Sequence, residues 1–167
     1  MRALNLSLAA AALSALASVL ASVLAQPAAA GQDGKGYPGS LCEELRLTRG
    51  FSIAVLSTGR IFNVSTDRTM ELACPIVKDI DGIGGAQVRV VDQHPTDDVV
   101  CTLRTFRFDG KVNNEQTQRT VGASPLVRQL DFVRQSGAGS HYELECDVPP
   151  RSPSTSGVVM YNIVEVN

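Results

Sequence analysis

The stretch from Arg60 to Val77, Arg-Ile-Phe-Asn-Val-Ser-Thr-Asp-Arg-Thr-Met-Glu-Leu-Ala-Cys-Pro-Ile-Val, decides the predicted fold. Within it the apolar residues recur at every second position, at Met70, Leu72, Cys74 and Ile76. A period of two is typical of a β-strand with one buried face and one wet face. Each later cysteine lies in a run of the same kind. The sequence therefore predicts a β-sandwich built around the strand that contains Cys74.

Short apolar runs separated by turns continue to the end of the chain. The predicted strands are 51–56, 61–64, 69–76, 86–92, 98–108, 111–121, 126–133, 141–148 and 158–166, with 111–121 as an edge strand. The glycine-rich segment 78–85 is predicted to be a loop. The last strand is apolar on both faces, so we expect it to be central or covered. The fold class is therefore all-β: an antiparallel β-sandwich, immunoglobulin-like or jelly-roll, with eight or nine strands.

The first 30 residues are predicted to be a secretory signal peptide with its cleavage region. Arg2 is their only charge, an apolar run covers 4–25, and small residues at 28–30 suit a signal peptidase. The alternative is an uncleaved anchor helix, because the run is about long enough to span a bilayer. The rest divides into a flexible leader at 31–41 and a sandwich domain at 42–167. We therefore expect a secreted or periplasmic protein with no membrane span in its mature chain.

The charge pattern argues against two classes of partner. The sequence has 15 lysines and arginines against 17 aspartates and glutamates, a net charge of −2. The two signs are mixed along the chain, and no block of lysine or arginine occurs. Binding to nucleic acid or to an anionic membrane surface needs such a basic footprint. We therefore expect neither of these partners.

Four cysteines in an exported chain predict two disulfides. No C-x-x-C pair occurs, so we expect no metal site. Cys101 and Leu103 share one strand face, as do Leu144 and Cys146. If these two strands pair antiparallel with Cys101 opposite Cys146, Leu103 falls opposite Leu144 and both pairs point into the core. We therefore predict the pairs Cys101–Cys146 and Cys42–Cys74.

Catalytic signatures do not occur in the sequence. His94 precedes a proline and is expected in a loop, whereas His141 begins a strand. No nucleophile elbow, H-E-x-x-H or phosphate-binding glycine loop is present. Glu143 and Glu145 share one face, which we interpret as a solvated face. We expect no enzyme and no cofactor, although a cleft that held either histidine against an acidic residue would favour an enzyme.

Phe106 and Phe108 are the candidates for a ligand-binding face. The sequence has five phenylalanines, three tyrosines and no tryptophan, so few rings are available for binding sugars. Strict alternation from Cys101 places both phenylalanines on the outer face. A β-bulge near Arg104–Thr105 would instead turn them into the core. We expect the bulge, because phenylalanine is more often buried.

Asn63-Val64-Ser65 has the form of an N-glycosylation site. Its meaning depends on the secretory route, and the asparagine can serve equally as the residue that joins a strand to a turn. The sequence leaves this open.

The order of several motifs resembles a group of small exported bacterial proteins. These motifs are Gly59-Arg-Ile61 with Asn63, Cys74-Pro75-Ile76, Cys101-Thr-Leu103, and Tyr142-Glu-Leu144-Glu-Cys146 with Pro149. The group consists of β-proteins with four cysteines, usually labelled hypothetical. The resemblance covers the chain from Cys42 to its end. It implies export and a β-sandwich, and it assigns no functional site.

Three functions fit these features. The leading one is a secreted, non-enzymatic structural or interaction protein that acts through its surface on a protein or cell-envelope partner. The first alternative is a carbohydrate-binding module, which requires Phe106 and Phe108, or Tyr161, to be exposed together. The second is a hydrolase inhibitor that inserts a loop such as 110–118 or 150–157 into an active site.

Overall fold

The computed structural model describes residues 33–45, 53–77, 79, 82–135 and 141–166. They form eleven strands and one short 3-10 helix, η1 (Gly39–Leu41). Sheet A contains, in spatial order, β3 (Ile53–Val55), β4 (Ile61–Asn63), β11 (Gly157–Val166), β6 (Gly82–Asp92) and β9 (Ser124–Gln135), with β1 (Asp33–Pro38) also beside β11. Sheet B contains β2 (Glu43–Glu44), β5 (Met70–Cys74), β10 (His141–Val148), β7 (Val100–Phe106) and β8 (Val112–Arg119).

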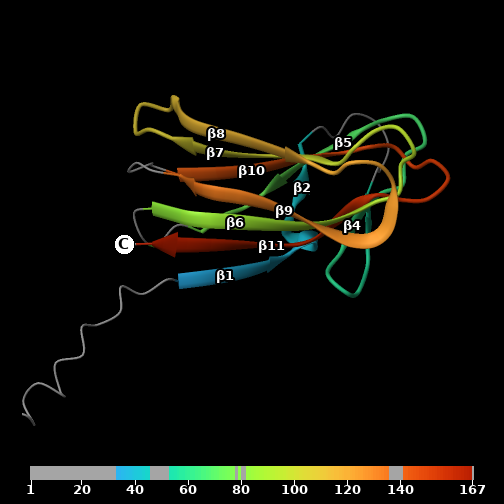
Figure 1. Ribbon diagram of the computed structural model, residues 1–167, viewed down its shortest axis with the longest axis horizontal. Helices are drawn as coiled ribbons and strands as arrows, with labels where there is room; N and C mark the ends of the chain where they lie inside the picture. Colours follow the sequence, from blue (N-terminus) through green and yellow to red (C-terminus); the bar gives the residue numbers. More distant parts are fainter. Residues whose placement is uncertain (1–32, 46–52, 78, 80–81, 136–140, 167) are drawn as a thin grey trace, which may run out of the picture. The chain divides into compact units, whose positions relative to one another are not determined.

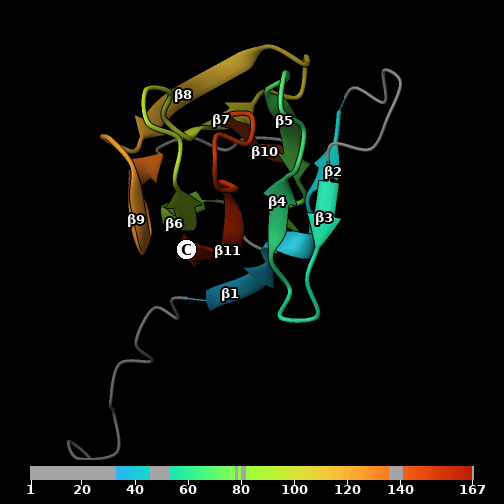
Figure 2. The same cartoon turned by 90° about the vertical axis from the view of Figure 1, so that its right-hand side faces the viewer.

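The two sheets pack face to face, as the end-on view in Figure 2 shows. Every strand pair is antiparallel, and the buried residues of both sheets form one core. The predicted antiparallel β-sandwich is therefore confirmed. β11 lies inside sheet A, between β6 on one side and β1 and β4 on the other (Figure 1), so the expectation that the last strand is central is confirmed. The two strands beyond the predicted nine are β1 and β2.

The prediction of a flexible leader at 31–41 is wrong for the central part of that segment. Residues 33–38 form β1, which pairs with β11 over its whole length. Lys35 reaches the buried Glu165 on β11, with Nζ and Oε2 2.7 Å apart, and Tyr37 stacks on Tyr161 at a centroid distance of 4.9 Å. This strand could not be recognised from the sequence because glycines occupy its other face. They remove the alternation of polar and apolar side chains on which the prediction depends.

The glycine-rich segment 78–85 was also expected to be a loop, and its second half is instead the start of β6. Gly84 and Gly85 lie in this strand, and adding a Cβ atom to Gly84 would bring it within 2.5 Å of Val166 Cγ1. Here glycine allows the close approach of β11 at a register shift and does not form a turn.

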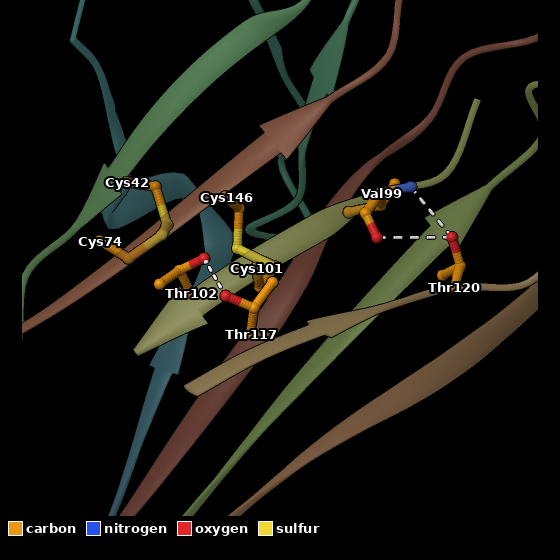
Figure 3. Close-up of a disulfide and its surroundings, with 8 residues drawn as sticks. All are labelled: Cys42, Cys74, Val99, Cys101, Thr102, Thr117, Thr120 and Cys146. Carbon is orange, nitrogen blue, oxygen red and sulfur yellow. Dashed lines mark hydrogen bonds between the residues drawn. A yellow bond between two sulfur atoms is a disulfide. The ribbon is translucent and has the colours of Figure 1, made fainter. Parts of the chain in front are cut away.

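Both predicted disulfides are present (Figure 3): one joins β7 to β10, and the other joins the residue before β2 to the last residue of β5. Cys101 joins Cys146 with Cα atoms 4.1 Å apart, and Cys42 joins Cys74 with Cα atoms 4.0 Å apart. Cys101 is directly opposite Cys146, and Leu103 is directly opposite Leu144, the register from which the pairing was predicted. All four cysteines are buried in the core.

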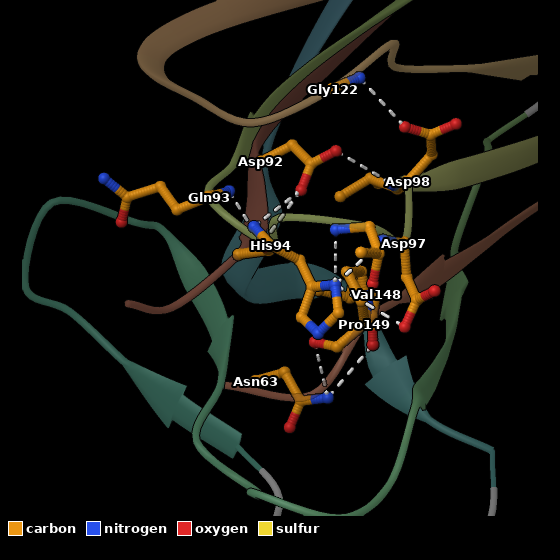
Figure 4. Close-up of polar contacts among 12 residues, drawn as sticks. Asn63, Asp92, Gln93, His94, Asp97, Asp98, Gly122, Val148 and Pro149 are labelled. Carbon is orange, nitrogen blue, oxygen red and sulfur yellow. Dashed lines mark hydrogen bonds and ion pairs between the residues drawn. The ribbon is translucent and has the colours of Figure 1, made fainter. Parts of the chain in front are cut away.

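Buried polar side chains close one end of the sandwich (Figure 4). Asp92, fully buried, accepts hydrogen bonds from His94 N (3.2 Å), Val99 N (3.3 Å), Ser156 Oγ (3.2 Å) and the hydroxyl of Thr120. His94 Nδ1 in turn accepts a hydrogen bond from Asp97 N (2.8 Å). His94 therefore lies in the loop after β6, as its position before a proline predicted, and its imidazole binds the backbone of that loop.

The open edge of sheet A is capped by a side chain from sheet B. The amide of Gln116, on edge strand β8, donates from Nε2 to Val133 O (3.2 Å) and accepts from Val133 N (3.0 Å) on edge strand β9. This pair of hydrogen bonds replaces the contact that a neighbouring strand would make. No described residue belongs to a helix of the length and apolar character that membrane crossing requires.

We expect Gln116→Ala to lower the free energy of unfolding by about 1 kcal/mol, because two hydrogen bonds to partly solvated backbone are lost. Urea denaturation measures the change. Gln118→Ala, an exposed position on the same strand, is the control. Equal stability of the two variants would show that the Gln116 amide does not secure the edge.

Candidate functional site

The outer face of sheet B carries the residues that the sequence singled out. On β7 the side chains of Cys101, Leu103 and Thr105 are buried, and those between them point outward and are half-buried. The alternation continues without a break to Phe106, which is on the outer face. The expectation that Phe106 turns into the core is therefore wrong.

A bulge does occur near Thr105, but it is on the neighbouring strand. Thr105 is opposite Asn114 and Phe106 is opposite Val112, so Asn113 of β8 is the extra residue. A bulge in the partner strand leaves the direction of the side chains on β7 unchanged.

The two phenylalanines have different surroundings. The ring of Phe106 stacks on the imidazole of His141 in β10, with centroids 4.5 Å apart and planes 4° from parallel. Phe108 lies in the turn between β7 and β8, closed by a hydrogen bond from Arg107 N to Lys111 O (2.8 Å), and it is 85% exposed. Tyr161, the third predicted ring, is fully buried. The outer face thus has one stacked ring pair, with an exposed ring at the turn.

His141 lines an open pocket of about 320 Å³ between β10 and the strands β5 and β2. Two carboxylates, Glu43 and Glu143, lie in the same pocket, and Ala73 and Pro75 contribute small apolar surfaces. Phe106 does not line the pocket and is stacked against the imidazole that does. The pocket therefore combines an aromatic ring, held in place by a second ring, with two groups that accept hydrogen bonds.

Charged residues beside the pocket are arranged around Arg104. Its Nε is 2.6 Å from Glu115 Oε2, its Nη1 hydrogen bonds to Glu145, and Glu143 is 3.8 Å away. Partial burial raises the pKa of Glu143, and the neighbouring negative charge of Glu145 raises it further. Arg104 opposes this shift only partly, because its shorter contacts are to the other two carboxylates.

Sequence reasoning found Phe106 and missed the pocket itself. His141 was noted without a partner, and Glu43 was not singled out. The register across strands brings these residues together: Phe106 is opposite His141, and Glu43 is opposite Ala73. The predicted Cys42–Cys74 pair was a signal for the second contact, since it places the residue after Cys42 beside the residue before Cys74.

Asn63 and one candidate inhibitor loop are parts of the framework of the fold. Asn63 is fully buried, and its Nδ2 donates to Arg68 O (2.8 Å) and, as Figure 4 shows, to Val148 O (3.0 Å) and Pro149 O (3.1 Å). A glycan would have to be attached to this same nitrogen, so the folded protein cannot be glycosylated there. Of the two loops considered for an inhibitor, 110–118 is mostly the regular strand β8.

Comparisons with known proteins bear on the fold. No family model matches the sequence, and no curated protein matches it. A solved low-affinity xylan-binding module, CBM86 from Roseburia intestinalis, superposes with a TM-score of 0.50 at 12% identity, covering 81% of this chain and 96% of that one. The carbohydrate-binding module CBM36, solved with calcium and xylotriose, gives 0.46 at 10% identity, covering 78% and 99%.

A family two carbohydrate esterase from Cellvibrio japonicus gives a TM-score of 0.48 at 2% identity, covering 81% of this chain and 34% of that one. At these identities the likeness to CBM86 shows the fold alone. This chain therefore has a β-sandwich of the shape found in that module.

Proposed function

We propose that this protein is an exported, non-enzymatic glycan-binding module that binds a sugar in the His141 pocket. The observation that carries the proposal is the imidazole of His141, stacked on Phe106, which lies beside two carboxylates in one open pocket. The apolar face of a sugar ring packs against an aromatic face, while its hydroxyl groups donate hydrogen bonds to the carboxylates. The shared fold with a xylan-binding module adds support and makes xylan a first ligand to test.

A protein partner, the leading expectation from the sequence, fits this face less well. A specific protein interface buries about 800 Å² on each partner and has an apolar centre. The outer face of sheet B instead carries Arg104 with three carboxylates around it. Such a face is suited to a small polar ligand in the pocket.

The test is retention of the oxidised protein on insoluble xylan, cellulose, chitin and purified cell walls. We expect retention on at least one matrix, and at least about tenfold weaker binding for Phe106→Ala and His141→Ala. Phe108→Ala is the matched control, because Phe108 is an exposed ring outside the pocket. Thermal unfolding of each variant verifies that the sandwich is intact.

The same samples test the non-enzymatic part of the proposal. His141 and Glu143 do share a pocket, the arrangement that would favour a hydrolase. We expect no release of reducing ends or acyl groups from any matrix. Release that stops in Glu143→Gln would identify an enzyme, and absence of retention on all four matrices would contradict glycan binding.

A further inference from the structure

The outer face of sheet A, on the other side of the sandwich from the His141 pocket, has a groove of about 420 Å³. It crosses β1, β11, β6 and β9, the first three of which lie side by side in Figure 1. Its lining includes four glycines, which are Gly34, Gly36, Gly84 and Gly85. An added Cβ atom on Gly34 would meet no atom within 4 Å. The groove exists because side chains are missing from the middle of a sheet face.

Polar side chains form a row along this groove. Asn162 of β11 is opposite Gln87 of β6, and Gln87 is opposite Asp131 of β9. The strand register thus places three hydrogen-bonding groups side by side, one on each of three neighbouring strands about 4.8 Å apart. The adjoining position on β1 is Gly36, which leaves the end of the row open.

The two amide side chains in this row make no hydrogen bond within the described part of the fold. Among the residues that the structure describes, neither the Asn162 nor the Gln87 side chain has a hydrogen-bond partner, although both are half-buried. Asp131 accepts one hydrogen bond, from Gln129 Nε2 at 2.8 Å. An amide both donates and accepts, so the row can pair with groups that do the same.

The charged groups that line the groove indicate which class of ligand it can bind. Of the two charged residues that line it, Lys35 directs its ammonium group away to Glu165 and Asp79, each at 2.7 Å. The groups left facing the groove are two neutral amides and one carboxylate. Neutral, polyhydroxylated chains match this set, since each hydroxyl donates and accepts. A strongly anionic or cationic ligand would find no complementary charge cluster.

We propose that this groove is a second glycan-binding surface, which holds a neutral polysaccharide chain lying across β1, β11, β6 and β9. The strand spacing is close to the length of one sugar ring, so successive rings of the chain can each meet one polar side chain. The glycine floor allows the rings to lie close to the backbone. This surface does not depend on the His141 pocket, and each can bind if the other does not.

The test follows the side-chain NH₂ signals of Gln87 and Asn162 by ¹H–¹⁵N correlation NMR, assigned from Gln87→Ala and Asn162→Ala. The probes are the hexasaccharides of xylan, cellulose, mannan and laminarin at millimolar concentration. We expect at least one of them to shift both side-chain signals and the backbone signals of Gly34 and Gly85. The shifts should persist in Phe106→Ala, which separates this surface from the His141 pocket.

Gly34→Val provides the decisive variant, because it fills the groove at an edge-strand position where a side chain meets nothing. We expect it to fold normally and to weaken the binding measured at Gln87 by at least about tenfold. Thr117→Val, an exposed strand position on sheet B, is the matched control. No shift at Gln87 and Asn162 with any hexasaccharide, or undiminished shifts in Gly34→Val, would overturn the proposal.

Discussion

Removing the Cys101–Cys146 disulfide in Cys101→Ala/Cys146→Ala is expected to lower the free energy of unfolding by about 4 kcal/mol. The two cysteines are separated by 45 residues, and in the chain-entropy model a loop of that size adds this much freedom to the unfolded chain when the bond is absent. The loss is a large part of the 5–15 kcal/mol typical of a whole domain.

Guanidinium denaturation of the oxidised double variant measures the change. Cys42→Ala/Cys74→Ala provides the comparison, with a separation of 32 residues and an expected loss only slightly smaller. A loss below about 1 kcal/mol for the first variant would show that this disulfide adds little to the register already set by the strands around it.

Replacing Asn63 by aspartate is expected to cost about 4 kcal/mol at neutral pH. The change keeps the size of the side chain and replaces its NH₂ group by an oxygen. That oxygen would face the carbonyls of Arg68, Val148 and Pro149, which now receive the three hydrogen bonds of Nδ2. A buried carboxylate oxygen that faces three carbonyl oxygens has no donor there and is repelled.

The pH dependence identifies the cause of this loss. Burial among carbonyls raises the pKa of an aspartate in the folded state, so the part of the penalty that comes from ionisation is absent below the unfolded value of about 3.9 and grows as the pH rises above it. Unfolding of Asn63→Asp and wild type at several pH values measures this. Asn113→Asp, at the exposed bulge of β8, is the control. A penalty that does not change with pH would contradict a buried charge as its source.

The sequence was sufficient for those parts of the fold that depend on alternation along one strand. Tyr142, Leu144, Cys146 and Val148 alternate without interruption, and β10 has the bounds that were predicted. The disulfide pairing followed because a cysteine and a leucine on each strand fix a register between two strands. The buried faces of β7 and β10 were readable from their own residues.

Contacts between strands were harder to predict from the sequence. β1 was missed because Gly34 and Gly36 carry no side chain to show which face is outside. The strand is held by Lys35 and Tyr37, which contact residues far away in the sequence. Phe106 was misplaced because a bulge was expected in β7, whereas the bulge lies in β8 and the simple alternation of β7 holds.

Both candidate sites depend on contacts between strands. Phe106 and His141 are 35 positions apart in the sequence and directly opposite in the sheet. Gln87 and Asn162 are still farther apart and also directly opposite. Each site is a row across strands, so it becomes visible only when the order and register of the strands are known.

The arrangement of the disulfides has a mechanical consequence. Each bond closes a loop of the chain, from Cys42 to Cys74 and from Cys101 to Cys146, with sequence separations of 32 and 45. If the two ends of the chain are pulled apart, neither loop can lengthen, because the load passes through the sulfur atoms. Only the chain outside the loops can extend, at about 3.5 Å per residue. Stretched in this way, the oxidised protein would lengthen far less than the reduced one, and β10 would stay linked to β7.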